Sequence, residues 1–468
     1  MEVATVILLL RAEWMRFIRH RPNLIILALA LLLLLAAAVS SGLEAARQRR
    51  EAAEKTAHWE GRLEALAMKL PARSEGESAA AARATFDFAR NEAPPALRPA
   101  LGGLALGVRQ FAALPSDVRV SVDSRHLDGR KSDVISNPLL HSVGMPDFSV
   151  VVALLVPLVV IGLGYGLVQE ARENGTWRLV CTQSPAPWKV PVASCIVRFM
   201  AVFAMVFIAS LVAFGLDPGA SLTAFLCWTL VSGVFCLIWF LVVALSCGLR
   251  ISAAASALGL LAIWLFTTFA VPPVLSALAE AAEPMPSRLD AMIKVRKAQL
   301  DAEAQEEGLL KAWYAGNPEH RPASIGKHAW PVSFMPRYEK QDSVIVPLMA
   351  EFDRKRARQA SFIERFAWLS PGLAIVMTGD RLAGADAQRY ARYAEAVDRF
   401  EARWCEFFVP RIMSYRGLSR EDLVDLPKFE SIEAESVLGV MPLMASAFGI
   451  ALVLLYLASR ARRLVATP

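Results

Sequence analysis

The sequence has few charged residues and no long polar stretch of biased composition. Charged residues make up 20% of the 468 positions, whereas 55% are apolar and the mean hydropathy is +0.40. Such a high apolar content excludes a disordered chain. The apolar residues also gather in long runs, which excludes an ordinary soluble enzyme. The composition therefore indicates a membrane protein that crosses the bilayer several times.

Cysteine and histidine are scarce, and their spacing matches no known metal or disulfide pattern. Of six cysteines, only Cys405 falls in a segment predicted to lie outside the cytoplasm, and one cysteine cannot form an intrachain disulfide. The six histidines are scattered, and HExxH, GxSxG and CxxC are absent. We therefore expect no catalytic residue, no metal and no cofactor on this chain.

The chain also lacks the residues that would power transport by itself. No GxxxxGK[ST] phosphate-binding loop is present, so we do not expect ATP hydrolysis by that mechanism. No Asp, Glu or His lies within an apolar run, although a proton- or sodium-coupled carrier would hold such groups. Arg198 is the only charge inside a run. No basic patch with interleaved aromatic residues occurs, so no nucleic-acid partner is expected.

Six apolar runs are each about long enough to cross a bilayer. They cover residues 24–39, 148–168, 192–216, 222–246, 251–275 and 437–459. We therefore predict an all-α polytopic membrane protein with six transmembrane helices and two mainly helical extracytoplasmic insertions. The expected divisions are an interfacial helix 1–23, the first transmembrane helix 24–43, a first outer domain 44–147, four spans 148–278 with an inner loop 169–190, a second outer domain 279–436, the sixth span 437–459 and a tail 460–468.

Lysine and arginine near the span ends set the expected orientation, because such residues stay in the cytoplasm. They precede the first run, lie between runs two and three and between runs four and five, and follow the last run. Both termini are therefore expected inside and both insertions outside. The first run also carries small residues at 36–40 that suit signal-peptide cleavage. We favour an uncleaved anchor, because the preceding segment is long and amphipathic.

Residues 3–19 have the pattern of a helix that lies on the membrane surface. The apolar residues Val6, Ile7, Leu10, Trp14, Phe17 and Ile18 recur at helical spacing, and a polar stripe includes Glu13 and Arg16. The candidate interface residues are Trp14, Arg16, Phe17 and Arg19. The alternative is an ordinary positively charged flank.

Further helices are predicted by composition and periodicity. Residues 44–70 are rich in good helix formers and should continue the first span out of the bilayer. Residues 287–315 carry large apolar side chains on roughly one side, among them Leu289, Met292, Ile293 and Leu300. An aromatic stripe over 386–413 is typical of core packing. Three glycines near the end of the second span allow close helix contact, namely Gly162, Gly164 and Gly166.

The segment after the second span carries a recognisable motif. It reads QEARENGTWRLVCTQSP over residues 169–185. This resembles the first cytoplasmic loop of ABC-2 type transporter permeases, in which an E-x-E-x-G-T-L-R stretch precedes a short helix. The positions on the pattern are Glu170, Arg172, Glu173, Gly175, Thr176 and Arg178, and Trp177 replaces the usual Leu. Two outer insertions and the stretch LSPGLA at 369–374 look like a bacterial subgroup of these permeases.

The resemblance implies the permease subunit of an ATP-binding cassette exporter in a bacterial inner membrane. The loop helix would then dock on a separate cytoplasmic ATPase, which binds ATP and Mg, and Glu173 would stabilise the start of that helix. Other implied partners are a second permease chain, identical or related, the membrane itself, and a periplasmic protein. One alternative is mechanical signalling to periplasmic partners without transport. A second is a membrane enzyme, and a third is that the loop is a plain capped turn.

Overall fold

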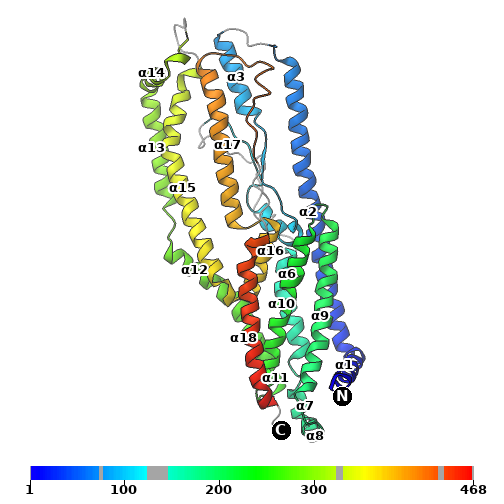
Figure 1. Cartoon of the computed structure of the whole chain (residues 1–468). Coiled ribbons are helices and arrows are strands. Elements are labelled where there is room, and N and C mark those ends of the chain that lie inside the picture. The colour runs from blue at the N-terminus through cyan, green and yellow to red at the C-terminus, as the bar shows by residue number, and fades with distance from the viewer. Residues whose placement is uncertain (1, 73–76, 124–145, 323–329, 431–436, 466–468) are drawn as a thin grey trace.

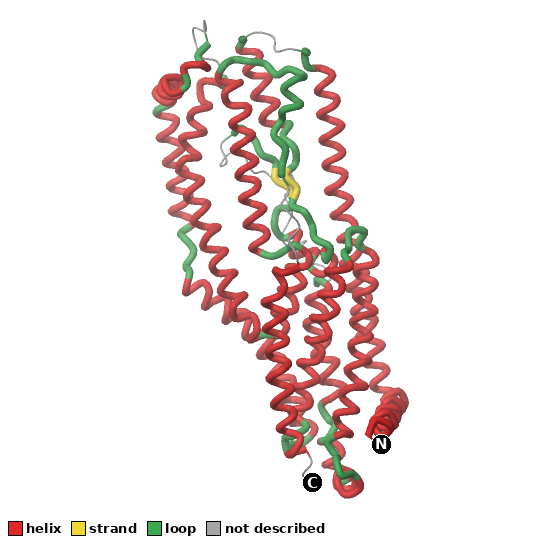
Figure 2. Tube along the Cα trace, in the orientation of Figure 1, coloured by secondary structure: helices red, strands yellow, loops and turns green. Residues whose placement is uncertain are grey.

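The computed structural model describes residues 2–72, 77–123, 146–322, 330–430 and 437–465, and the chain is 79% helical. The molecule is elongated, with a bundle of apolar helices at one end and a group of more polar helices at the other (Figures 1 and 2). Among the described residues, six helices are long and apolar enough to cross a membrane. The protein is therefore an α-helical membrane protein.

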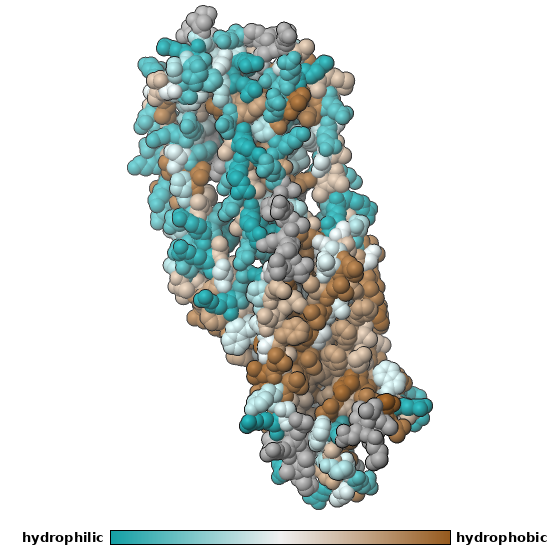
Figure 3. Space-filling model, viewed as in Figure 1, coloured by the Kyte–Doolittle hydropathy of each residue, from teal (hydrophilic) through white to brown (hydrophobic). Residues whose placement is uncertain are grey.

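The apolar bundle contains the six predicted spans. Its surface forms a hydrophobic band over the lower half of the molecule, whereas the upper half is hydrophilic (Figure 3). The helices of the bundle are α2 (Arg21–Lys69), α6 (Phe148–Gly164), α9 (Lys189–Leu216), α10 (Leu222–Ser246), α11 (Ala253–Leu265) and α18 (Met441–Val465). Helix α11 continues through a π-helical turn, η2 (Phe266–Ala270), into α12 (Val271–Ala282).

The first span continues far beyond its apolar run. Helix α2 has 49 residues, so it extends for roughly 74 Å at 1.5 Å per residue. This confirms the helix predicted over 44–70 and shows that it is one with the first span. Gly42 lies inside α2, where an added Cβ would sit 2.7 Å from Cβ of Leu216. A glycine at this position lets α2 and α9 pack closely.

The remaining helices lie mainly at the polar end of the molecule. The longer ones are α3 (Ala79–Asn91), α13 (Arg288–Ala304), α14 (Glu306–Gly316), α15 (Met335–Phe366), α16 (Pro371–Ala383) and α17 (Ala387–Met413). The short ones are η1 (Leu104–Leu106), α4 (Val108–Ala112), η3 (Pro318–His320), η4 (Val332–Phe334), η5 (Ala367–Leu369) and η6 (Val437–Val440). Two short antiparallel strands, β1 (Ala96–Leu97) and β2 (Asp117–Val118), are the only sheet in the described ranges.

The two insertions share one hydrophobic core, although the sequence led us to treat them as separate domains. That core includes side chains of α3, α14, α15 and α17, with the outer end of α2 packed against it. Hydrogen bonds join the insertions: Trp404 Nε1 donates to Ala89 O at 2.9 Å, and the Tyr393 hydroxyl donates to Ala96 O at 2.6 Å. The polar end of the molecule is therefore a single composite domain.

The segment predicted as one helix over 287–315 differs from the expectation in two ways. It is divided into α13 and α14, and α13 turns its small residues inward. Ala291, Ala298 and Ala302 are buried together with Val295, whereas Leu289 and Met292 are 66% and 70% exposed. Small side chains let α13 approach α15 closely, so Leu289 and Met292 need not fill the space between the two helices.

Candidate functional site

The predicted inner loop forms two short helices at the end of the molecule where α1 (Glu2–Arg19) also lies (Figure 1). These are α7 (Gln169–Glu173) and α8 (Thr176–Gln183). Between them Gly175 adopts a left-handed backbone conformation with φ of 71°. The Thr176 hydroxyl donates to Ala171 O at 3.1 Å across this turn. A glycine suits this conformation because it carries no Cβ to clash.

Helix α7 is anchored between the end of α10 and the start of α11. Gln169 is fully buried, and its Nε2 donates to Ser246 O at 2.8 Å. Arg172 Nη1 donates to Leu249 O at 2.8 Å, and the Glu173 carboxylate accepts the backbone N–H of Ala253 at 2.8 Å. Helix ends leave such groups without intrahelical partners. The loop thus satisfies groups at the junction of two spans.

Glu173 therefore differs from its expected role at the start of the loop helix. It is in the last turn of α7, before the reversal at Gly175, so its carboxylate faces α11. Gln169 was not among the predicted site residues, although it precedes the acidic motif directly. The only sequence signal for Gln169 was an amide at the end of an apolar run.

Helix α8 has one buried face and one exposed face. Trp177 is only 3% exposed and packs with Val168 and Cys247. Arg178 is exposed, and Leu179 is 61% exposed. Glu170 is exposed, and its carboxylate lies against Gly166, where an added Cβ would clash with it. A short helix held on one face and open on the other is suited to contact with a soluble protein.

The glycines of the second span lie in different surroundings. An added Cβ on Gly164 would be 2.7 Å from Cγ1 of Val243, so α6 and α10 touch closely there. The nearest atom to such a Cβ on Gly162 is 3.9 Å away, on Ile26, which is an ordinary contact. Gly166 makes room for Glu170 of the following helix. The close packing of α6 on α10 therefore requires a glycine at position 164 but not at position 162.

Helix α1 packs on α9 through residues that were expected to face elsewhere. Phe17 is 3% exposed, and the guanidinium of Arg198 lies 5.6 Å from the centre of its ring. Glu13, expected in the polar stripe, is buried and accepts a hydrogen bond from Ser194 Oγ at 2.9 Å. Arg198 also donates from Nε to Leu163 O at 2.8 Å. The hydrogen bond from Ser194 offsets part of the cost of burying the Glu13 carboxylate.

The rest of α1 keeps an exposed apolar side. Trp14 is 46% exposed, as are Ile7 at 60% and Ile18 at 41%, and Arg16 and Arg19 are exposed as well. An amphipathic helix with this surface is suited to lie at the membrane interface. Of the four predicted interface residues, Phe17 is the one that faces the bundle instead.

A second cluster of contacts joins the spans to the composite domain, at the ends of the spans far from α7 and α8 (Figure 1). We call residues 100–107 the clasp. Arg49 of α2 donates from Nε to Asp217 Oδ1 at 2.5 Å and from Nη2 to Leu101 O at 2.6 Å. Two backbone hydrogen bonds extend these contacts. Gly102 O of the clasp accepts the N–H of Ser221 at 3.0 Å, and the N–H of Gly103 donates to Leu382 O at 3.0 Å. The clasp therefore touches α2, the start of α10 and the end of α16.

Asp147 holds the segment that follows the clasp. Its carboxylate accepts the backbone N–H groups of Arg109 at 2.9 Å and Gln110 at 3.1 Å. Asp147 directly precedes α6, so a further span is fastened at the same level. Nearby, burial and the charge of Asp147 raise the pKa of Asp380 to about 8. The sequence offered no signal for these contacts, because their partners are far apart along the chain.

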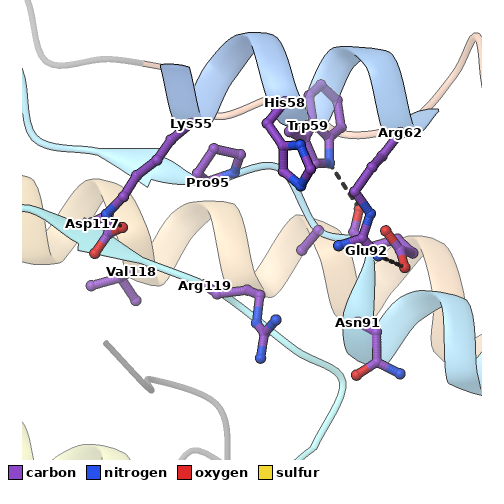
Figure 4. Close-up of a pocket in the computed structure, with 11 residues that line it drawn as sticks. Lys55, His58, Trp59, Arg62, Asn91, Glu92, Pro95, Asp117, Val118 and Arg119 are labelled. Atoms are coloured by element: carbon purple, nitrogen blue, oxygen red, sulfur yellow. Dashed lines mark hydrogen bonds and ion pairs between the residues drawn. The ribbon is translucent and has the colours of Figure 1, made fainter. Parts of the chain in front are cut away.

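A cavity of about 150 Å³ opens between the C-terminal half of α2 and the strands (Figure 4). Two ion pairs line it, Lys55 with Asp117 and Arg62 with Glu92. Trp59 Nε1 donates to the backbone oxygen of Glu92 at 3.1 Å. These pairs link α2 to β2 and to the residue that follows α3. The charged groups at the cavity thus fasten α2 to the composite domain.

No group of three or more His, Cys, Asp or Glu side chains in the described ranges is arranged to hold a metal ion. In comparisons with known proteins, residues 288–431 match a family described as a domain of unknown function (DUF3526). No curated protein and no solved structure matches the chain. The matched region runs from α13 to the end of the second insertion and includes none of the six apolar helices.

Proposed function

We propose that this chain is the permease subunit of an ATP-binding cassette exporter. It works with a separate cytoplasmic ATPase, which binds ATP and Mg, and with a second permease chain. In this proposal the chain lies in a bacterial inner membrane with both termini and the inner loop in the cytoplasm. The composite domain then lies in the periplasm.

The geometry of the inner loop carries the proposal. Helix α8 offers an exposed surface around Arg178 and Leu179, and α7 is hydrogen-bonded to the junction of α10 and α11. Movement of an ATPase against α8 would therefore be transmitted to α10 and α11 through the hydrogen bonds of α7. Such small shifts at a packed interface are the usual input for rigid-body motion.

Affinity purification of the full chain from its native membrane tests this proposal. The wild type should bring down an ATPase that hydrolyses ATP. Leu179→Glu places a charge on the exposed face of α8 and should abolish the co-purification. Met68→Glu is the matched control, because Met68 is 75% exposed at the outer end of α2. Wild-type recovery and turnover with Leu179→Glu would contradict the proposal.

Mechanical signalling is the second candidate, and one observation favours it. Helix α2 is unbroken from the inner end of the bundle to the composite domain, where Leu63 and Leu66 pack on the core. The clasp and the two ion pairs at the cavity fasten it there. Displacement of the inner end of α2 would therefore move the composite domain, whether or not a solute crosses.

Inside-out vesicles separate the two candidates. Spin labels at Met68 and at Leu222, which is 71% exposed at the start of α10, report movement of the composite domain. Mass spectrometry of the same vesicles reports any solute or lipid moved by ATP. ATP-dependent accumulation supports export. ATP-dependent movement without accumulation supports signalling.

A further inference from the structure

The cavity beside α2 has a lining that is basic on balance. Its charged and titratable side chains are Lys55, His58, Arg62, Arg119, Glu92 and Asp117. Lysine and arginine supply three positive charges against two negative ones, and His58 adds a fourth positive charge when it is protonated. Such a lining favours a negatively charged ligand over a positively charged one.

Both acidic side chains of the lining are shielded by their cations. Asp117 and Glu92 are 15% and 14% exposed, whereas their partners Lys55 and Arg62 are 39% and 50% exposed. An ion that enters from solution therefore meets positive charge first. His58 is exposed and takes no part in either pair, so the lining contains more than is needed to fasten α2.

Hydrogen-bond donors converge on this space from two sides. His58 and Arg62 are four residues apart and so share a face of α2, and Arg119 and Asn91 lie across the cavity from them (Figure 4). Arg62 has further N–H groups beyond the one that it gives to Glu92. The cavity volume of about 150 Å³ is enough for several water molecules or for a small anion.

Trp59 gives the cavity a fixed apolar wall. Its indole Nε1 donates to Glu92 O at 3.1 Å, which holds the ring in one orientation beside His58 (Figure 4). Binding sites for small molecules commonly combine an aromatic wall with a few convergent polar groups. The lining thus has both parts of such a site.

A lipid headgroup of the same membrane lies too far away to fill the cavity. His58 is 15 residues beyond Leu43, where the predicted first span ends, which is about 22 Å along α2 at 1.5 Å per residue. The headgroup layer on one side of a bilayer is only about 5–8 Å thick. An anion in the cavity must therefore come from the solution around the composite domain.

We propose that this cavity binds a small soluble oxyanion, a carboxylate or a phosphate, with His58, Arg62, Asn91 and Arg119 as its donors. The ligand would contact α2 on one side and the segment after β2 on the other. It therefore joins α2 to the composite domain, as the two ion pairs do, and stabilises the folded chain through binding. The inference is independent of whether the chain exports a solute or transmits a movement.

Equilibrium dialysis of the full chain in detergent tests the site, with labelled succinate and labelled inorganic phosphate as separate probes. The wild type should bind at least one of them saturably. Arg119→Gln should weaken that binding at least about tenfold, because a charged donor is lost. Arg50→Gln is the matched control, since it removes the same charge from an exposed position of α2 outside the lining. Absence of saturable binding to the wild type, or equal affinities of the two variants, would overturn the inference.

Two further measurements keep the result separate from a failure to fold. His58→Gln alters an exposed side chain and should also weaken binding, whether or not Arg119→Gln is stable. Hydrogen exchange of the wild-type chain locates the ligand, because the bound anion should slow exchange in peptides that cover residues 55–62 and 117–119. Unchanged binding by His58→Gln, or slower exchange only in other parts of the chain, would contradict the proposed site.

Discussion

Replacing Arg49 by alanine should destabilise the junction between the spans and the composite domain. The Arg49 side chain is 20% exposed, and the side chain of its partner Asp217 is 1% exposed. Two hydrogen bonds join them, at 2.5 and 3.1 Å, and a third runs from Arg49 to Leu101 O. The variant leaves a buried carboxylate without its cation.

Removing one partner of a buried ion pair costs about 3–5 kcal/mol. Part of Arg49 remains accessible to solvent, so we expect the lower end, about 3 kcal/mol of unfolding free energy. Arg47→Ala is the control, since Arg47 is 68% exposed on the same helix and pairs with Glu51 at 2.8 Å. Exposed pairs at this helical spacing contribute about 0.3–0.5 kcal/mol.

Thermal unfolding of the purified chain, followed by tryptophan fluorescence, measures the difference. Arg49→Ala should lower the midpoint by roughly 3 °C, and Arg47→Ala by about half a degree or less. Adding Asp217→Ala to Arg49→Ala should restore part of the loss, because no unpaired buried charge then remains. Equal midpoints for the two single variants would refute the reasoning.

Four further substitutions test the glycines and the acidic residue described above. Gly175→Ala forces a side chain into the left-handed region and should cost about 1 kcal/mol, measured as a lower thermal midpoint; an unchanged midpoint would contradict the turn. Gly164→Ala should cost about 1–3 kcal/mol by pressing on Val243, whereas Gly162→Ala should be tolerated, and equal losses would exclude the close contact. The raised pKa of Asp380 keeps its carboxyl group protonated in the folded state, so the free energy of unfolding should fall as pH rises from about 4 through about 8. Thermal midpoints of the wild type should therefore be lower at pH 9 than at pH 6. Asp380→Asn should remove this difference.

Hydropathy and periodicity were sufficient for the parts of the fold that depend on local composition. The six spans follow from apolar runs, and the aromatic stripe of α17 is in the core, where Phe400, Trp404 and Phe408 have no exposed surface. The start of α16 depends on local sequence as well, because Ser370 accepts the N–H of Leu373 at 3.1 Å and a proline follows it. Local rules of this kind need no knowledge of distant residues.

Contacts between distant residues could not be predicted in the same way. Arg49 and Asp217 are 168 positions apart, and Glu13 and Ser194 are 181 apart. Nothing in the local sequence distinguishes a carboxylate that meets such a partner from one in solvent. For α13 the sequence predicted the helical period but not which side is buried, because apolar content alone does not show that alanines permit a closer approach.

The composite domain also dictates an order of folding during synthesis. Thr85 bonds to Arg416 O and Arg420 bonds to Ala67 O, over separations of 331 and 353 residues. Because four spans lie between these segments, the first insertion is synthesised long before its partners are made. Its apolar face, including Phe86 and Phe88, stays uncovered during that interval. Native contacts of such high sequence separation form late, so cells that make this protein must keep a half-domain soluble while its other half is translated.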